Sequence, residues 1–305
     1  MVRFILRRAA LGVLVAFTVM TLAFMLTRLS GDLAISIAGP GASQQDIEII
    51  RKAYGLDRPV VVQFVNWMGR AMVGDLGDSF FFKDRVSNLI LQRMPITMTL
   101  GLVGLGLALL ISIPLGTLAA VREGTWIDRA VTIVTMVGQA MPSFWFGLIL
   151  MITLGLTLGW LPISGTGSWQ HFVMPGIVLA LTATPALTRL TRSGMIEAIS
   201  SDYIRTARAK GLSRASIIFK HALRNAAIPV VSIAAVQLGF MLSGSVVVET
   251  VFALHGVGFL GWESITKNDF PVVQGIFLVV AVIYIVLTML ADILNALLDP
   301  RIRST

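Results

Sequence analysis

The chain has 305 residues, of which 56% are apolar and only 13% are charged, and its mean hydropathy is +0.85. Soluble globular domains rarely reach these values, so the composition indicates an integral membrane protein. The formal net charge is +8, but the basic residues gather near the N-terminus and in one loop, which membrane topology explains without nucleic acid. The chain contains no cysteine, which excludes disulfides, thiolate metal sites and a cysteine nucleophile.

The N-terminal segment places Arg3, Arg7 and Arg8 ahead of an uncharged run over residues 9–27. This run is longer than the apolar part of a signal peptide, and no small-residue cleavage site follows it. We therefore predict a retained first transmembrane helix.

The next segment, residues 29–93, carries seven basic and seven acidic residues. We expect it to lie outside the membrane on the non-cytoplasmic side, because its charges balance and long loops translocate regardless of charge. Within it, the stretch SQQDIEIIRKAYGL predicts a short amphipathic helix that Ser43 caps and Gly55 ends.

Four further uncharged stretches are long enough to cross about 30 Å of hydrocarbon. They cover residues 94–121, 130–188, 226–248 and 271–291. The second is too long for one helix, and its GWLPISGTGSWQH segment predicts a turn flanked by interfacial tryptophans. We therefore predict an all-α integral membrane protein with six transmembrane helices.

Loop charges predict the orientation of these helices, because Lys and Arg accumulate on the cytoplasmic side. The segment 189–224 carries eight basic residues against Glu197 and Asp202, whereas the segment 249–270 carries one basic residue against three acidic ones. Both termini are therefore expected in the cytoplasm.

The basic cytoplasmic loop predicts a helix, a sharp turn and a second helix. Ser200 or Ser201 can cap the first helix, Gly211 can end it in a left-handed conformation, and Ser213 can cap the second. Small and basic side chains near the turn suit a docking element that enters a groove on a partner. The alternative is that the basic residues only set topology and contact anionic lipid.

The stretches DYIRTARAKGL and HALRNAAIPV resemble the coupling loop of permease subunits of binding-protein-dependent ABC importers, in their dipeptide, oligopeptide and nickel branch. Of that family's general loop pattern, only Ala207, Gly211 and Leu223 are kept. The stretches GDLGDSF, MPITMTL, MPSFWFG, LPISG, ETVFALHGVGFLG and DPRIR are also similar to this branch and follow in its order.

The resemblance implies a multi-pass permease subunit of the bacterial inner membrane, with a first helix in residues 1–28, a periplasmic subdomain in 29–93 and a permease core in 94–305 whose coupling loop is 195–225. It implies a heterodimer with a second homologous permease, two ABC ATPase subunits, a periplasmic solute-binding protein and the lipid bilayer as partners. The chain has no GxxxxGK[ST] phosphate loop. It is therefore expected to be a transport subunit rather than an enzyme, without a bound cofactor, while partner subunits use ATP.

The resemblance also assigns residue roles. ATPase coupling falls to the first helix of the basic loop and its turn: Asp202, Tyr203, Arg205, Thr206, Ala207, Arg208, Lys210 and Gly211. Gln139, Pro142 and Gln237 are candidates for the translocation path or gating, although prolines can be structural kinks and glutamines can bond neighbouring helices. Glu249 and His255 are expected in an outer loop that could meet the binding protein or simply face solvent.

The solute stays open among di- or oligopeptides, nickel, glutathione and opines. The three histidines do not favour nickel, since His221 is expected on the opposite side of the membrane from His171 and His255. An ion-coupled secondary transporter is the alternative of another class, but the spans hold almost no ionisable residues apart from Asp292.

Overall fold

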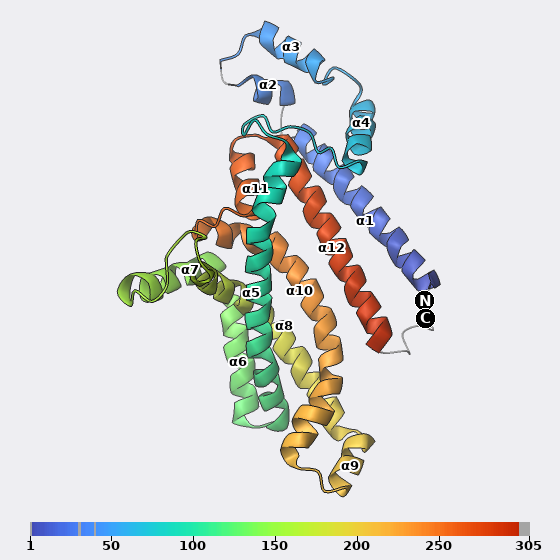
Figure 1. Ribbon diagram of the computed structural model, residues 1–305, viewed down its shortest axis with the longest axis vertical. Helices are drawn as coiled ribbons and strands as arrows, with labels where there is room; N and C mark the ends of the chain where they lie inside the picture. The colour runs from blue at the N-terminus through green and yellow to red at the C-terminus, as the bar shows by residue number, and fades with distance from the viewer. Residues whose placement is uncertain (1, 30–31, 40, 299–305) are drawn as a thin grey trace. The chain divides into compact units, whose positions relative to one another are not determined.

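A computed structural model describes residues 2–29, 32–39 and 41–298, and these residues form helices joined by loops, with one isolated bridge between Asp78 and Arg85. The longer helices are α1 (Val2–Leu29), α5 (Val86–Val121), α6 (Trp126–Ala140), α8 (Val173–Ser200), α10 (Leu223–Val251) and α12 (Phe270–Leu298) (Figure 1). The shorter ones are α2 (Leu33–Ala38), α3 (Gln44–Ala53), α4 (Val60–Met72), α7 (Ser143–Leu150), α9 (Asp202–Ala209), α11 (Val257–Thr266), π-helical η1 (Met151–Thr157) and η3 (Ser216–Ala222), and 3-10 helical η2 (Trp169–Phe172). The DPRIR stretch lies outside the described residues.

Five helical segments of the described chain are long and apolar enough to span a membrane, and the number becomes six if one bent pair forms a single broken span rather than a re-entrant loop. The pair consists of α6 and the segment Ser143–Thr157, which meet at 98°. The predicted all-α membrane protein is thus confirmed, with five apolar spans and the bent pair in the place of the predicted third one. Met141 and Pro142 have extended backbones at the bend, and proline lacks the N–H that would continue a helix.

Helix α8 continues to Ser200, twelve residues beyond the apolar run that ends at residue 188. Hydropathy ends where charged residues begin, whereas backbone hydrogen bonds continue through them. Charged residues that hydropathy assigns to a loop, such as Arg189 and Arg192, therefore belong to helix α8.

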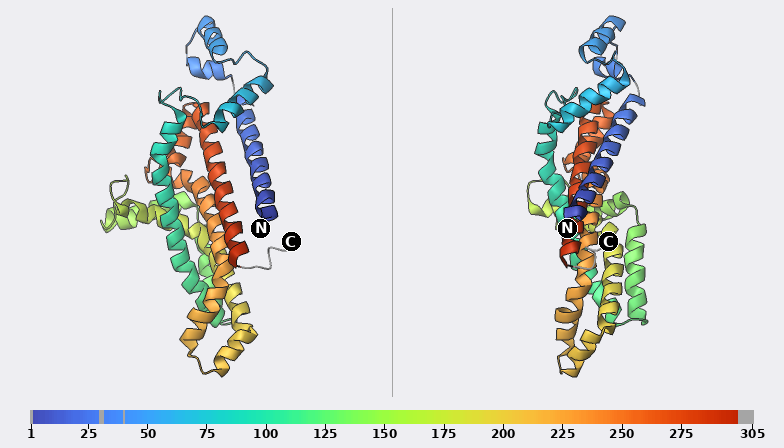
Figure 2. Two further views of the ribbon diagram at one scale, coloured as in Figure 1. Left: turned by 45° about the vertical axis from the view of Figure 1, so that its right-hand side comes forward. Right: turned by 90° about the vertical axis from the view of Figure 1, so that its right-hand side faces the viewer.

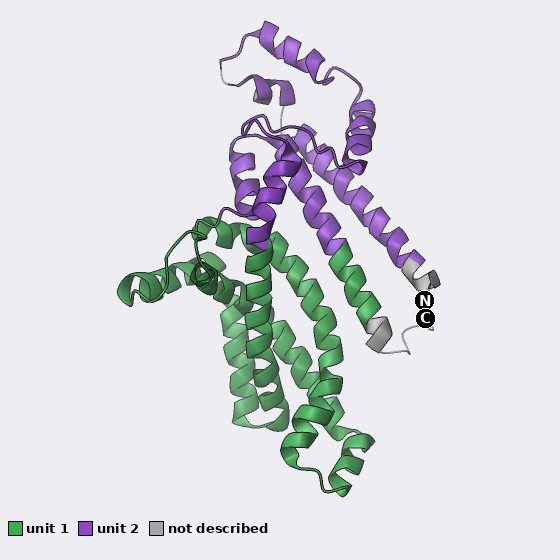
Figure 3. Ribbon diagram, in the orientation of Figure 1, with its two compact units in different colours: residues 1, 98–254, 286–305 green, residues 2–97, 255–285 purple. Residues whose placement is uncertain are grey.

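The chain divides into two compact units (Figure 3). Unit 1 contains residues 98–254 and the chain from 286 onward, and unit 2 contains residues 2–97 and 255–285. Helices α5 and α12 contribute residues to both units. The division into 1–28, 29–93 and 94–305 stays a prediction.

In unit 1, α8 packs against both α6 and α10 (Figure 2). Glycines bring α5 close to α8, because a Cβ on Gly116 would lie 2.6 Å from the Thr191 Cβ and 2.7 Å from the Thr188 carbonyl oxygen. Gly104 faces Leu179 in the same way, at 2.9 Å. Small residues at such crossings let helix backbones approach closely. This close packing matters within a bilayer, because the hydrophobic effect does not drive helices together there.

In unit 2, a buried carboxylate fixes the loop that contains GDLGDSF. Asp269 is 1% exposed and accepts hydrogen bonds from the Ser79 hydroxyl and from the backbone N–H groups of Phe80 and Phe81. The predicted amphipathic helix is confirmed as α3, with a capping box between Ser43 and Asp46. Its predicted stop is also confirmed, since Gly55 has a left-handed φ of +63°.

The α5–α8 crossing predicts opposite effects for two glycines of one helix. We expect Gly116→Ala to destabilise the purified protein by about 1–3 kcal/mol, because the added methyl group overlaps Thr191. Gly106→Ala is the matched control, since its Cβ would meet nothing within 4 Å, and alanine favours the helix. Thermal unfolding in detergent measures both variants, and equal midpoints would contradict the tight crossing.

Candidate functional site

The basic loop folds as a helical hairpin. Helix α9 follows α8 after one residue, and Gly211 ends it with a left-handed φ of +76°. Ser213 caps the next helix, since its hydroxyl accepts from the Ser216 N–H at 3.3 Å. The predicted helix, turn and helix are therefore confirmed. Ser201 stands at the N-cap position of α9, but its hydroxyl donates to the Ala198 carbonyl at 2.5 Å instead of capping the helix.

An apolar cluster holds α9 against its neighbours. Ile204 is completely buried and Ala207 is 7% exposed. They pack with buried residues of α5, α8, η3 and α10, namely Ala120, Met195, Ala198, Ile217, Ala222 and Ala226. In addition, the Asn225 side-chain amide donates to the Tyr203 hydroxyl at 2.8 Å. The hairpin is thus packed onto the ends of α8 and α10.

The outer face of the hairpin is polar and basic. Seven of the eight residues predicted for ATPase coupling are exposed: Asp202, Tyr203, Arg205, Thr206, Arg208, Lys210 and Gly211. The exception is Ala207, which belongs to the buried cluster and therefore does not offer a low-bulk surface to a partner. These seven exposed residues include three basic ones and one acidic one. The Asp202–Arg205 pair among them is almost fully exposed, so it adds little stability.

The polar candidates for the translocation path lie around the bend between α6 and α7. Gln237 on α10 and Ser143, the first residue of α7, line one cavity of about 240 Å³ together with Thr182 of α8. Pro142 immediately precedes this cavity wall and stands at the bend itself. Gln139 is exposed near the end of α6 and does not line the cavity.

The two predicted contacts for the binding protein lie in different environments. The expectation that Glu249 lies in an outer loop is wrong, because Glu249 belongs to α10, is completely buried and accepts from the Ser245 hydroxyl at 2.8 Å. Its charge suggested a loop, but helix α10 continues past it to Val251. His255 does lie in an exposed loop, with its ring against Phe259 at 4.8 Å and its carbonyl accepting from Arg93.

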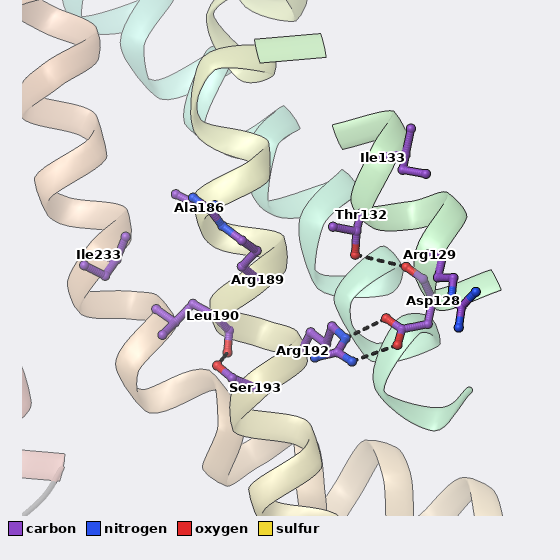
Figure 4. Close-up of a pocket in the computed structure, with 10 residues that line it drawn as sticks. All are labelled: Asp128, Arg129, Thr132, Ile133, Ala186, Arg189, Leu190, Arg192, Ser193 and Ile233. Atoms are coloured by element: carbon purple, nitrogen blue, oxygen red, sulfur yellow. Dashed lines mark hydrogen bonds and ion pairs between the residues drawn. The ribbon is translucent and has the colours of Figure 1, made fainter. Parts of the chain in front are cut away.

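A second charged site was missed by hydropathy, because its residues lie just outside the apolar runs. Asp128 at the start of α6 accepts from Arg192 of α8 through both carboxylate oxygens, at 2.6 and 2.7 Å (Figure 4). It also accepts from the Gly124 N–H at 3.0 Å, and its side chain is 9% exposed. Arg129 and Arg189 line the same cavity of about 810 Å³. No local signal in the sequence joins these residues, because Asp128 and Arg192 are 64 positions apart.

Comparison with known families identifies the family to which this chain belongs. Residues 112–304 match the family described as the binding-protein-dependent transport system inner membrane component. Residues 1–101 match the N-terminal family of membrane components of the same transport systems. The chain therefore belongs to the family of binding-protein-dependent transport system permeases, which are multi-pass components of the bacterial inner membrane and transport subunits rather than enzymes.

Curated relatives match along the whole chain. The oligopeptide transport system permease protein AppB of Bacillus subtilis is 40% identical over 314 residues, with 99% of both chains covered. A putative peptide transport system permease protein of Brucella abortus is 38% identical over 312 residues, again with 99% of both chains covered. The glutathione transport system permease protein GsiC of Escherichia coli is 36% identical over 304 residues, with the same coverage.

Solved structures share the fold at lower identity. A chain of the MetNI methionine ABC transporter in an inward-facing conformation superposes with a TM-score of 0.57 at 20% identity, covering 69% of this chain and 96% of that one. A chain of an amino acid ABC transporter crystallised with histidines gives a TM-score of 0.50 at 18% identity, covering 70% and 94%. The shared fold is therefore that of ABC transporter permeases.

The bidentate Asp128–Arg192 contact predicts strong coupling between these residues. We expect Asp128→Asn to destabilise the protein by about 1–3 kcal/mol, because it leaves a half-buried guanidinium without its counter-ion. Adding Arg192→Met should restore most of the loss, since no unpaired charge then remains. Thermal unfolding of both single variants and the double variant gives the interaction energy, and additive losses would contradict the pairing.

Proposed function

We propose that this chain is one of two different permease subunits in an ATP-driven importer of di- or oligopeptides, which a periplasmic binding protein delivers. The full-length similarity to permeases named for oligopeptides, peptides and glutathione supports a peptide-type solute, since glutathione is itself a small peptide. The same machinery could instead carry nickel or an opine, and the solute test below separates these alternatives.

We propose further that α9 and its turn dock on an ATPase subunit. The hairpin supports this role because its exposed basic face is backed by a buried apolar cluster. A partner that binds Arg205 and Arg208 and displaces α9 would therefore also displace α8 and α10, because Ile204 packs against both helices. Closure of two ATPase subunits on ATP would then displace these helices as bodies, without any nucleotide chemistry on this chain. Both termini are assigned to the cytoplasmic side with the hairpin.

Charge reversal on the exposed face tests the docking role. We expect Arg205→Glu combined with Arg208→Glu to weaken retention of the ATPase subunits at least about tenfold. A basic face pairs with an acidic partner surface, and the two glutamates would repel that surface. The fold should persist, since both side chains are exposed and only Arg205 makes an ion pair, a weak one. Co-purification from membranes and solute-stimulated ATP hydrolysis measure the effect.

Arg122→Glu is the matched control, because Arg122 is also exposed and basic but lies outside the hairpin, in the turn between α5 and α6. Equal retention of the ATPase subunits by the double variant and the wild type would refute docking through α9. The basic loop would then be a topology signal.

A reconstitution test identifies the solute. The four membrane and ATPase subunits, placed in proteoliposomes with the binding protein, should accumulate a labelled dipeptide only when ATP is supplied. Unlabelled peptides should compete, whereas Ni²⁺ and opines should not. Uptake of Ni²⁺ alone, or uptake driven by an ion gradient without ATP, would refute the peptide importer.

A further inference from the structure

Unit 2 contains a cavity of about 490 Å³ that no predicted role uses. Helices α1, α2, α4 and α12 and the loops before α4 and α5 all contribute to its wall. Three aromatic residues line it, namely Tyr54, Trp67 and Phe80, together with the cationic and amide side chains of Arg28, Arg58 and Gln63. Its volume falls within the range of small-molecule sites, which combine apolar walls with a few polar groups.

The first unusual group in this cavity is the amide of Gln63. Its Nε2 donates to the Leu56 carbonyl at 3.1 Å and to the Arg58 carbonyl at 2.7 Å. Because both partners are acceptors, the amide cannot be flipped, and Oε1 has to point the other way. That Oε1 is buried and has no hydrogen-bond donor within the described part of the chain. A buried acceptor without a donor is costly and calls for an N–H or O–H group.

The second unusual group is the guanidinium of Arg28. It stacks over the Phe24 ring at 5.0 Å, and its Nε is buried with no acceptor in residues 2–29, 32–39 and 41–298. The nearby carboxylate of Asp32 is already bound by Arg51. Among the described residues, Arg28 makes no ion pair. By contrast, Arg70 in the same wall is paired with Asp75 at 2.7 Å, and its hydrogen bond lowers the pKa of that carboxyl.

Within the described part of the chain, one cavity therefore combines an arginine that makes no ion pair and an amide oxygen that accepts no hydrogen bond, beside the carboxylate of Asp78 in the same wall. A carboxylate is the bidentate partner that a guanidinium prefers, and a peptide N–H is the donor that an amide oxygen accepts. Aromatic walls add apolar surface for a side chain. A small peptide carries all three features, whereas a simple anion carries only the first.

We propose that this cavity binds a small peptide, with its carboxylate on Arg28, an N–H on the Gln63 Oε1 and a side chain against Trp67 and Phe80. The Arg28 Nε and the Gln63 Oε1 are covered in the ligand-free chain. Binding therefore requires both side chains to turn toward the cavity, and for Gln63 this breaks its hydrogen bonds to the Leu56 and Arg58 carbonyls. The site rests on the proposed function and on the periplasmic placement of residues 29–93, and it receives solute on the outer side of the membrane.

Binding to the assembled transporter without its binding protein tests the site. The probe is tritiated alanyl-phenylalanine, added to the four-subunit complex in nanodiscs of phosphatidylcholine. We expect saturable binding that Arg28→Gln weakens at least about tenfold and Gln63→Leu weakens about threefold or more, whereas Arg28→Lys retains part of it. Lys52→Gln is the matched control, since Lys52 is an exposed cation of the same insertion that does not line the cavity.

A peptide amide distinguishes ligand contact from a structural role. The wild type should bind alanyl-phenylalanine amide about tenfold more weakly than the acid, and Arg28→Gln should bind both forms equally. If Arg28→Gln fails to assemble, the acid-to-amide ratio on the wild type and the Arg28→Lys variant still decide the question. Equal binding of acid and amide by the wild type would overturn the assignment of Arg28.

The remaining outcomes separate this site from the proposed function. No saturable binding by a complex that imports peptides with its binding protein would overturn the site and leave the proposed function intact. Failure to import any peptide even with the binding protein would instead refute the proposed function. Retention of an anionic phospholipid by the wild type but not by Arg28→Gln, measured by mass spectrometry without peptide binding, would overturn the site in favour of a lipid headgroup.

Discussion

The apolar contact beneath α9 is the interaction on which the rest of unit 1 depends. An isolated helix of eight residues is not stable in water, because nucleation costs more than so few hydrogen bonds return. Ile204 and Ala207 overcome this cost by burying themselves against Met195 of α8 and Ala222 of η3. The hairpin is therefore a packed extension of α8 and α10 rather than a flexible loop. A displacement of its exposed face would move these two helices with it.

From the hairpin, a series of packed contacts leads through unit 1 to the bend. Helix α8 carries Arg192, whose bidentate contact with Asp128 joins it to the first turn of α6. Helix α6 then ends at the 98° bend, beside the cavity that Gln237 lines. Packed cores resist gradual deformation, so a displacement of α8 moves its neighbours as bodies. These continuous contacts can carry a displacement from the hairpin to the bend. They would act as a conformational switch if the same helices had a second stable arrangement.

The sequence predicts most of this fold, because its signals are local. Long uncharged runs locate the spans, and the spacing of Gly211 and Ser213 predicts the hairpin turn. The errors share one cause, since a hydropathy run ends at the first charge whether or not the helix ends there. Asp128 and Arg192 stabilise helices beyond their apolar runs, and Glu249 is accommodated inside α10 by a hydrogen bond from Ser245. The Asp128–Arg192 pair joins residues 64 positions apart, which no local pattern reveals, whereas Ser245 and Glu249 are four positions apart on one helix and a hydropathy count does not consider that spacing.

Buried polar groups of two kinds occur in unit 2. A buried polar atom without a partner is costly. Asp269 accepts three hydrogen bonds and the Gln274 amide donates to the Thr27 hydroxyl, whereas the Ser264 hydroxyl is buried without a partner among the described residues. Arg28 and Gln63 line one cavity, and among the described residues Arg28 makes no ion pair and the Gln63 Oε1 accepts no hydrogen bond. Two unrelated packing defects would have no reason to complement each other in this way, whereas a ligand that carries both an acid and an N–H satisfies the two together.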